Sequence, residues 1–145
     1  MGDRGRAGRV EAFRRVVFLT PCKLIPMSTP SVSIHPYFKV HPGKMDAAKA
    51  LLPAFVEKTK SEPGCLFYEF TVNDDVVLCR EAYADAAAAL AHLENVDALL
   101  KEMLQNSDLL RLEFHGPAAE LDQLKGPLAG LNPTWFAFEC GVERK

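Results

Sequence analysis

The sequence contains no apolar run that approaches the ~20 residues needed by a membrane-spanning helix. A membrane-spanning segment, and with it a membrane partner, is therefore not expected. The chain has 145 residues, of which 48% are hydrophobic and 25% are charged. These fractions are ordinary for one globular domain with a single hydrophobic core.

Cysteine is scarce and widely spaced. No two cysteines form a C-x-x-C pair, and no histidine lies beside them at the spacing of a zinc ligand, so no metal site is expected. A disulfide framework is not expected at this density either. We therefore interpret all four cysteines as reduced thiols, which favours the cytoplasm or an organelle matrix. They are Cys22, Cys65, Cys79 and Cys140.

Several functional motifs are also missing. The sequence has no phosphate-binding glycine loop and no nucleophile elbow, which disfavours nucleotide-dependent and acyl-transfer enzymes. No basic stripe remains after residue 27. Nucleic-acid binding by the folded part therefore has no electrostatic basis.

Positive charge is concentrated at the N-terminus instead. Residues 1–30 are rich in arginine, contain three prolines and lack a clear periodicity, so we predict an arm outside the fold. One interpretation is a transit peptide within residues 1–26, which would direct import into an organelle. The other is an upstream extension of a protein whose natural start is Met27.

From residue 31 onward, regular elements alternate with turn signals. Residues 31–40 alternate between apolar and polar side chains, which predicts a strand. A helix follows and ends at Glu62-Pro63-Gly64, because proline cannot continue it and glycine supplies the turn. Asn73-Asp74-Asp75 is typical of a hairpin turn. The other predicted elements are strands over 65–72, 76–83 and 109–114 and a helix over 84–105.

The order of these elements predicts the fold class. Strand, helix, strand, strand, helix, strand is the order of an α+β, ferredoxin-like βαββαβ fold with an antiparallel sheet. Two helices cover only one face of such a sheet. The bare face would expose tyrosine, phenylalanine and valine side chains, so we expect a partner to cover it. The simplest partner is a second copy, which predicts a homodimer.

The predicted domain spans residues 31–145, with a core over 31–115 and a C-terminal extension over 116–145. Leucines between residues 118 and 131 predict a short helix that breaks near Gly126-Pro127. Residues 134–142 then alternate as a fifth strand. We hypothesise that this edge strand crosses onto the partner.

Three short motifs resemble a known family. Residues 62–69 read E-P-G-C-L-F-Y-E, residues 81–83 read E-A-Y, and residues 91–93 read A-H-L. In this order and at these distances they strongly resemble the antibiotic biosynthesis monooxygenase (ABM) family of the dimeric α/β barrel superfamily. The resemblance covers about residues 31–115. It implies a homodimer whose paired sheets enclose a pocket for a small, mostly apolar molecule.

The resemblance also implies a function. It favours a cofactor-independent monooxygenase, an oxidoreductase acting on a small aromatic or quinol-like substrate. The alternatives are a non-catalytic or stress-response dimer that binds a small hydrophobic metabolite, an isomerase, or a haem-degrading enzyme. Many relatives carry a second histidine five residues after the position of His92, where this chain has Asp97. This difference disfavours haem, so we expect no cofactor.

The predicted catalytic residues are His35, His92 and Glu81. Histidine titrates near neutral pH, which suits a general base, and Glu81 could orient a histidine or act as the base itself. Strand parity predicts that His35 points into the barrel, away from the helices. Plainer interpretations stay open: a polar interface residue for His35, a surface or capping group for His92, and an ion pair for Glu81.

The predicted substrate-binding residues are Tyr37, Tyr68 and Tyr83. A tyrosine hydroxyl can donate a hydrogen bond to a developing oxyanion. Tyr37 shares the polar face of the first strand with His35, and Tyr83 shares a face with Glu81. Tyr68 and Tyr83 serve equally well as core aromatics with satisfied hydroxyls.

Overall fold

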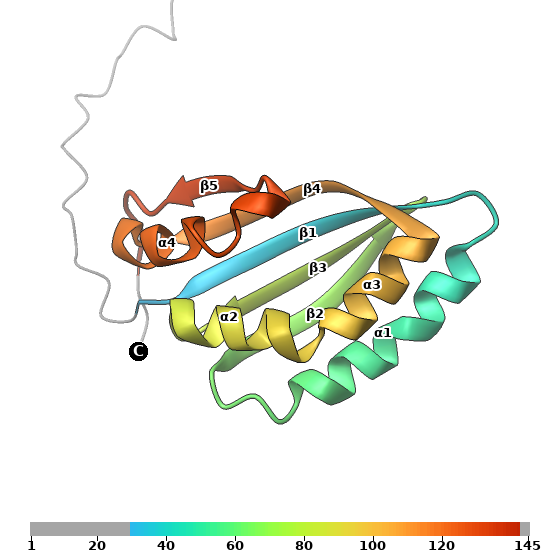
Figure 1. Ribbon diagram of the computed structural model, residues 1–145, viewed down its shortest axis with the longest axis horizontal. Helices are drawn as coiled ribbons and strands as arrows, with labels where there is room; N and C mark the ends of the chain where they lie inside the picture. Colours follow the sequence, from blue (N-terminus) through green and yellow to red (C-terminus); the bar gives the residue numbers. More distant parts are fainter. Residues whose placement is uncertain (1–29, 143–145) are drawn as a thin grey trace, which may run out of the picture.

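The computed structural model describes residues 30–142, so the predicted arm lies outside the described residues apart from Pro30. The predicted α+β fold is confirmed (Figure 1). The elements are β1 (Val32–Val40), α1 (Met45–Thr59), β2 (Cys65–Asn73), β3 (Val76–Tyr83), α2 (Ala86–Asn95), α3 (Asp97–Asn106), β4 (Ser107–Gly116), α4 (Ala118–Lys125), the 3-10 helix η1 (Ala129–Leu131) and β5 (Thr134–Ala137).

The strands form one five-stranded sheet in the order β2-β3-β1-β4-β5. β1 pairs antiparallel with β3 and β4, and β2 pairs antiparallel with β3. This is the ferredoxin-like arrangement expected from the element order. The hairpin between β2 and β3 turns at Asp74, whose φ of 50° lies in a left-handed region that aspartate tolerates. Figure 1 shows α1, α2 and α3 on one face of the sheet.

The alternation of β1 separates a helix-covered face from a bare face. Val32, Ile34 and Phe38 are almost fully buried against the helices, whereas Ser33 and His35 are half-buried on the opposite side. The faces predicted for this strand are confirmed. Within residues 30–142 the buried clusters place every α-helix on the covered face.

The register extends this parity to the neighbouring strands. Ile34 lies opposite Glu81 of β3 and Phe114 of β4, so these side chains share the covered face. His35 lies opposite Glu113, which places this glutamate on the bare face. The two faces therefore carry different sets of titratable residues.

Two apolar clusters fill the covered face. One packs β1, β3 and β4 against α2 and α4, and the other packs β1 and β3 against α1 and α3. Tyr83, Phe55 and Phe114 are the largest of the fully buried side chains. Each contributes about 1.5–3 kcal/mol of hydrophobic stabilisation. None of the helices within residues 30–142 is long and apolar enough to span a membrane.

The second predicted helix is divided. The sequence predicts one helix over residues 84–105, whereas the structure has α2 and α3, which meet at Val96 with φ −99° and ψ 4°. The predicted continuity is therefore wrong. Residues 84–105 contain no glycine or proline to mark a bend. The Val96 side chain is buried in the α1–α3 cluster, so tertiary packing accompanies this break rather than a local helix breaker.

The C-terminal extension packs on its own chain. The predicted break in its helix is confirmed, because α4 ends at Lys125 and η1 follows. The fifth strand is Thr134–Ala137 rather than 134–142, and it pairs in parallel with β4. Within the described chain β5 pairs with its own β4, and its crossing onto a partner stays a prediction. Trp135 packs against Phe114 with ring centroids 5.0 Å apart, which attaches β5 to its own core.

Candidate functional site

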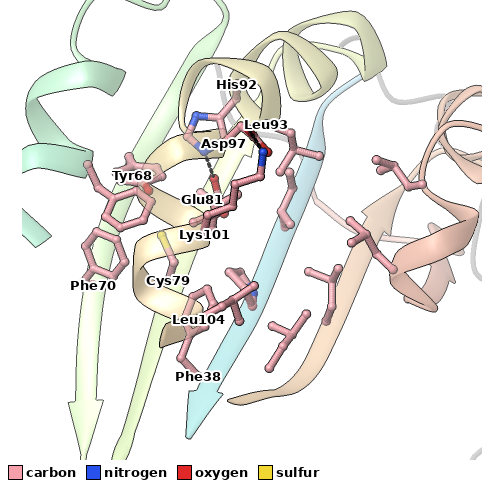
Figure 2. A pocket seen from close by; sticks show the side chains of 18 residues that line it. Phe38, Tyr68, Phe70, Cys79, Glu81, His92, Leu93, Asp97, Lys101 and Leu104 are labelled. Carbon is pink, nitrogen blue, oxygen red and sulfur yellow. Dashed lines mark hydrogen bonds and ion pairs between the residues drawn. The ribbon is translucent and has the colours of Figure 1, made fainter. Parts of the chain in front are cut away.

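A cavity of about 320 Å³ lies on the covered face of the sheet (Figure 2). This volume is at the lower end of the range for small-molecule sites. The family resemblance implies a pocket between paired sheets, whereas this cavity lies within one chain, between the sheet and the helices. The alternation of a strand predicts which side chains share a face of the sheet. It does not predict where a cavity lies between that face and the helices. The lining residues are Ile34, Pro36, Phe38, Phe55, Tyr68, Phe70, Cys79, Glu81, His92, Leu93, Asp97, Leu100, Lys101, Leu104, Leu109, Leu112, Leu128 and Leu131.

His92 lies at the wall of this cavity between two carboxylates. The α2 helix that carries it is capped by Asp85, whose side chain accepts a hydrogen bond from the Ala88 N–H at 2.8 Å. The Nδ1 atom of His92 is 3.0 Å from Glu62, and its Nε2 atom is 3.1 Å from Oε2 of Glu81. Figure 2 shows the carboxylate of Glu81 facing the imidazole.

These contacts determine the charge of His92. Burial lowers its pKa, but the hydrogen bond and charge of Glu81, together with those of Glu62, outweigh burial and raise the pKa above 6.5. The imidazolium form donates one N–H to each carboxylate. In this form His92 is a cation held between two carboxylates, and it acts as a donor to both.

Glu81 receives a second donor from its own strand. The Tyr83 hydroxyl donates to Oε2 of Glu81, the oxygen that also faces His92. Burial and the neighbouring Glu81 raise the pKa of Tyr83, so its hydroxyl stays protonated. Both contacts end on Oε2, and Glu81 lines the cavity. The site is thus a buried carboxylate fixed by two donors beside an apolar space.

Glu62 belongs to this site, although its sequence context indicates only a helix end. Its carboxylate binds His92 and also accepts a hydrogen bond from Asn95 at 2.6 Å. Gly64 lets this turn approach α2, because a Cβ at that position would lie 2.5 Å from the Ala88 Cβ. The E-P-G motif was the available signal, since its glutamate precedes the glycine that contacts α2.

Tyr68 also lines this end of the cavity, next to His92. Its ring lies 5.2 Å from that of His92, and its hydroxyl approaches the Cys79 thiol and Thr59. Burial raises the pKa of both Tyr68 and Cys79, so the hydroxyl and the thiol stay protonated. The structure therefore brings four predicted site residues together: His92, Glu81 and Tyr68 line the cavity, and Tyr83 is buried against Glu81 and His92.

The other two predicted residues, His35 and Tyr37, lie on the bare face and do not reach this cavity. His35 Nε2 is 3.0 Å from the Ser33 hydroxyl, and its ring packs edge-on against His115 at 4.9 Å. Burial and the charge of His115 lower the pKa of His35. Tyr37 pairs across the sheet with Arg111. The sequence prediction of their face is confirmed, but the cavity is on the other side.

Two features of the described residues concern the binding of a metal or haem. Within residues 30–142, no group of three or more histidine, cysteine, aspartate or glutamate side chains is arranged to hold a metal ion. Asp97, five residues after His92, forms an ion pair with Lys101 at 2.6 Å. The absence of a cofactor stays a prediction.

The comparisons with known proteins agree with this architecture. The family model for antibiotic biosynthesis monooxygenase matches residues 31–99. MupZ from Pseudomonas fluorescens is similar in structure, with a TM-score of 0.77 and 40% sequence identity, over 80% of this chain and 91% of MupZ. The chain belongs to the antibiotic biosynthesis monooxygenase family, as its motifs predicted.

More distant structures share the fold. A candidate antibiotic biosynthesis monooxygenase from Caulobacter crescentus is 24% identical, with a TM-score of 0.54 over 59% of this chain and 88% of that protein. Rv0793 from Mycobacterium tuberculosis is 21% identical, with a TM-score of 0.54 over 60% of this chain and 94% of Rv0793. The search of curated proteins found no match.

Proposed function

We propose that the chain is a cofactor-independent monooxygenase in which Glu81 takes a proton from a small phenolic or quinol-like substrate. The arrangement of Glu81 carries the proposal: its buried carboxylate lies at the wall of an apolar cavity and contacts two donors through one oxygen. Family membership supports a monooxygenase-like reaction.

Glu81, rather than His92, is the proposed base. An imidazolium with a raised pKa has no lone pair with which to accept a proton. His92 and Tyr83 instead hold Oε2 of Glu81, which leaves Oε1 to meet the substrate. The contacts of Glu62 orient His92 from its other side. His92, Tyr83 and Glu62 are therefore proposed as positioning residues.

The apolar cavity supports the reaction that follows proton removal. Deprotonation makes the substrate an electron-rich anion, and a water-poor site preserves its reactivity toward dioxygen. A quinol supplies all the electrons for this step. One oxygen atom enters the ring, the other leaves as water, and the organic product is a hydroxyquinone.

Oxygen uptake by metal-free protein tests the proposal with a panel of phenols and quinols. Glu81→Gln keeps the shape of the side chain but not its basicity, so kcat is expected to fall by about 100-fold or more. Glu113→Gln is the matched control, because it alters another buried glutamate of the sheet, on the bare face. Equal loss in both variants would contradict the role of Glu81.

Other outcomes distinguish the alternative functions. Conversion of substrate without oxygen would replace monooxygenation by proton transfer alone, as in an isomerase. A small molecule that co-purifies with the protein and is never converted would indicate a binding protein. A Soret band that appears with added haem and disappears in His92→Ala would indicate haem chemistry.

We also propose that a second copy covers the bare face. Phe67, Phe136 and Phe138 remain 45%, 39% and 38% exposed, and Phe136 stacks on His115 of that face. Exposed aromatic side chains grouped on one face favour association. Sedimentation should show a dimer for the wild type and a monomer for Phe136→Asp. Val56→Asp, on exposed α1, is the control, and a wild-type monomer would contradict the proposal.

A further inference from the structure

The cavity has two chemically different ends. Aromatic and polar side chains lie near Glu81, on β2, β3 and α2, and include Tyr68, Phe70 and His92. Leucines line the part toward β4 and the C-terminal extension: Leu109 and Leu112 of β4, and Leu128 and Leu131 after α4. We call these four residues the leucine end. Leu128 packs in the same buried cluster as Leu112, so extension and sheet meet there.

The order of the strands gives the distance between these ends. Glu81 is on β3, and β1 separates β3 from β4. Two strand spacings amount to about 10 Å. An extended chain of about eight carbon atoms covers this distance, given C–C bonds of about 1.5 Å. A single aromatic ring beside Glu81 would leave the leucine end unfilled.

The polarity of the lining restricts what can occupy that end. The polar side chains of the lining are Tyr68, Cys79, Glu81 and His92 near the carboxylate, and Asp97 with Lys101. Asp97 and Lys101 are exposed on α3 and bind each other at 2.6 Å. The leucine end offers no side-chain hydrogen bond, so a polar group placed there would lose its hydration without compensation.

We propose that the ligand has an acidic head at Glu81 and an unbranched aliphatic tail that lies across β1 to the leucine end, where Leu128 and Leu131 set the tail length. This inference rests on the proposed function for the polar head. It makes the C-terminal extension a determinant of specificity. The match to MupZ covers more of the chain than residues 31–116 can supply, so the similarity extends beyond the core.

Calorimetric binding of 4-alkylphenols, from methyl to octyl, tests this site without requiring turnover. The Kd of the wild-type protein should fall by about fourfold for each added methylene until the leucine end is full, and then stay constant. Leu131→Trp should shift this plateau to shorter tails. Leu128→Ala should shift it to longer tails.

Two further variants provide a control and a substitute for Leu131→Trp. Ala129→Trp introduces the same side chain on the exposed side of η1, outside the lining, and should bind like the wild type. Leu104→Trp narrows the cavity from α3 at a position 46% exposed, so it serves if Leu131→Trp does not fold. A Kd independent of tail length, or the same Kd series for Leu131→Trp and Ala129→Trp, would overturn the proposal.

The outcomes also separate this inference from the proposed reaction. Length-dependent binding without oxygen uptake would refute monooxygenation and leave the tail site standing. Oxygen uptake with short phenols, together with a Kd that does not depend on tail length, would refute the tail site and support monooxygenation. Loss of binding of all alkylphenols in Glu81→Gln, at every length, would be consistent with both.

Discussion

Each face of the sheet carries a buried or half-buried histidine, and the surroundings of the two histidines shift their pKa values in opposite directions. On the covered face, the His92 side chain is 2% exposed and contacts Glu62 and Glu81. On the bare face, His35 is half-buried and contacts Ser33 and His115. The pKa of His92 is raised, whereas that of His35 is lowered.

The difference shows that hydrogen-bond partners can outweigh burial. The pKa of the more deeply buried histidine is raised, because both of its ring nitrogens face carboxylates. The less buried histidine loses its proton more readily, because burial is reinforced by a second imidazole. The positive charge of a protonated histidine is therefore favoured at His92, beside the cavity, where it can orient Glu81 as the base.

The largest expected effect is on stability. His92→Ala leaves Glu62 and Glu81 buried without their shared cation, which should destabilise the fold by about 3–5 kcal/mol. His35→Ala removes a half-buried contact and should cost about 1 kcal/mol or less. Urea unfolding followed by circular dichroism measures both. Equal losses of unfolding free energy in the two variants would contradict the difference between the two faces.

The pH dependence of stability should differ in sign between the faces. The raised pKa of His92 contributes stability that is full below pH 6.5 and is lost as pH rises through the folded-state pKa. The lowered pKa of His35 makes stability fall as pH drops below 6.5. Each slope is at most about 1.4 kcal/mol per pH unit, and smaller for half-exposed His35.

Glutamine variants separate these two slopes. His92→Gln should remove the loss of stability above pH 6.5, and His35→Gln the loss below it. Urea midpoints measured from pH 5 to 9 supply the comparison (a range of about two pH units on either side of neutrality). A His92→Gln profile that superimposes on the wild type would contradict the raised pKa.

A smaller effect is expected from Glu62→Gln. Glutamine can still accept a hydrogen bond from His92 but carries no charge, which weakens the contact by about 1 kcal/mol. The kcat should therefore fall about fivefold, with the pKa of His92 lowered. Kinetics and histidine titration of the same variant check both effects. A loss as large as that of Glu81→Gln would give Glu62 a more direct role.

The fold could be predicted because its signals are local. The alternation over residues 31–40 determines which side chains face the helices, and the E-P-G-C motif marks the turn before β2. The break at Val96 was missed because it follows from packing, with no glycine or proline nearby. The pairing of β5 was missed because an edge strand has two possible neighbours.

The candidate site could be predicted only in part. Glu81 and Tyr83 share a face by parity, so their meeting follows from the sequence. Glu62 and His92 are 30 residues apart, and only the docking of α2 brings them together. His35 was included because a polar histidine on a strand suggests chemistry, but parity does not say which face encloses a cavity. The depth of a cavity depends on helix placement, which no local pattern encodes.

The most direct test is a nuclear magnetic resonance titration of the ring nitrogens of the four histidines in the full chain. Both faces are then measured in one sample. The result expected is a pKa for His92 above 6.5 and a pKa for His35 below it. A His92 pKa below 6.5 would make the imidazole neutral and able to accept a proton, and would contradict the assignment of Glu81 as the base.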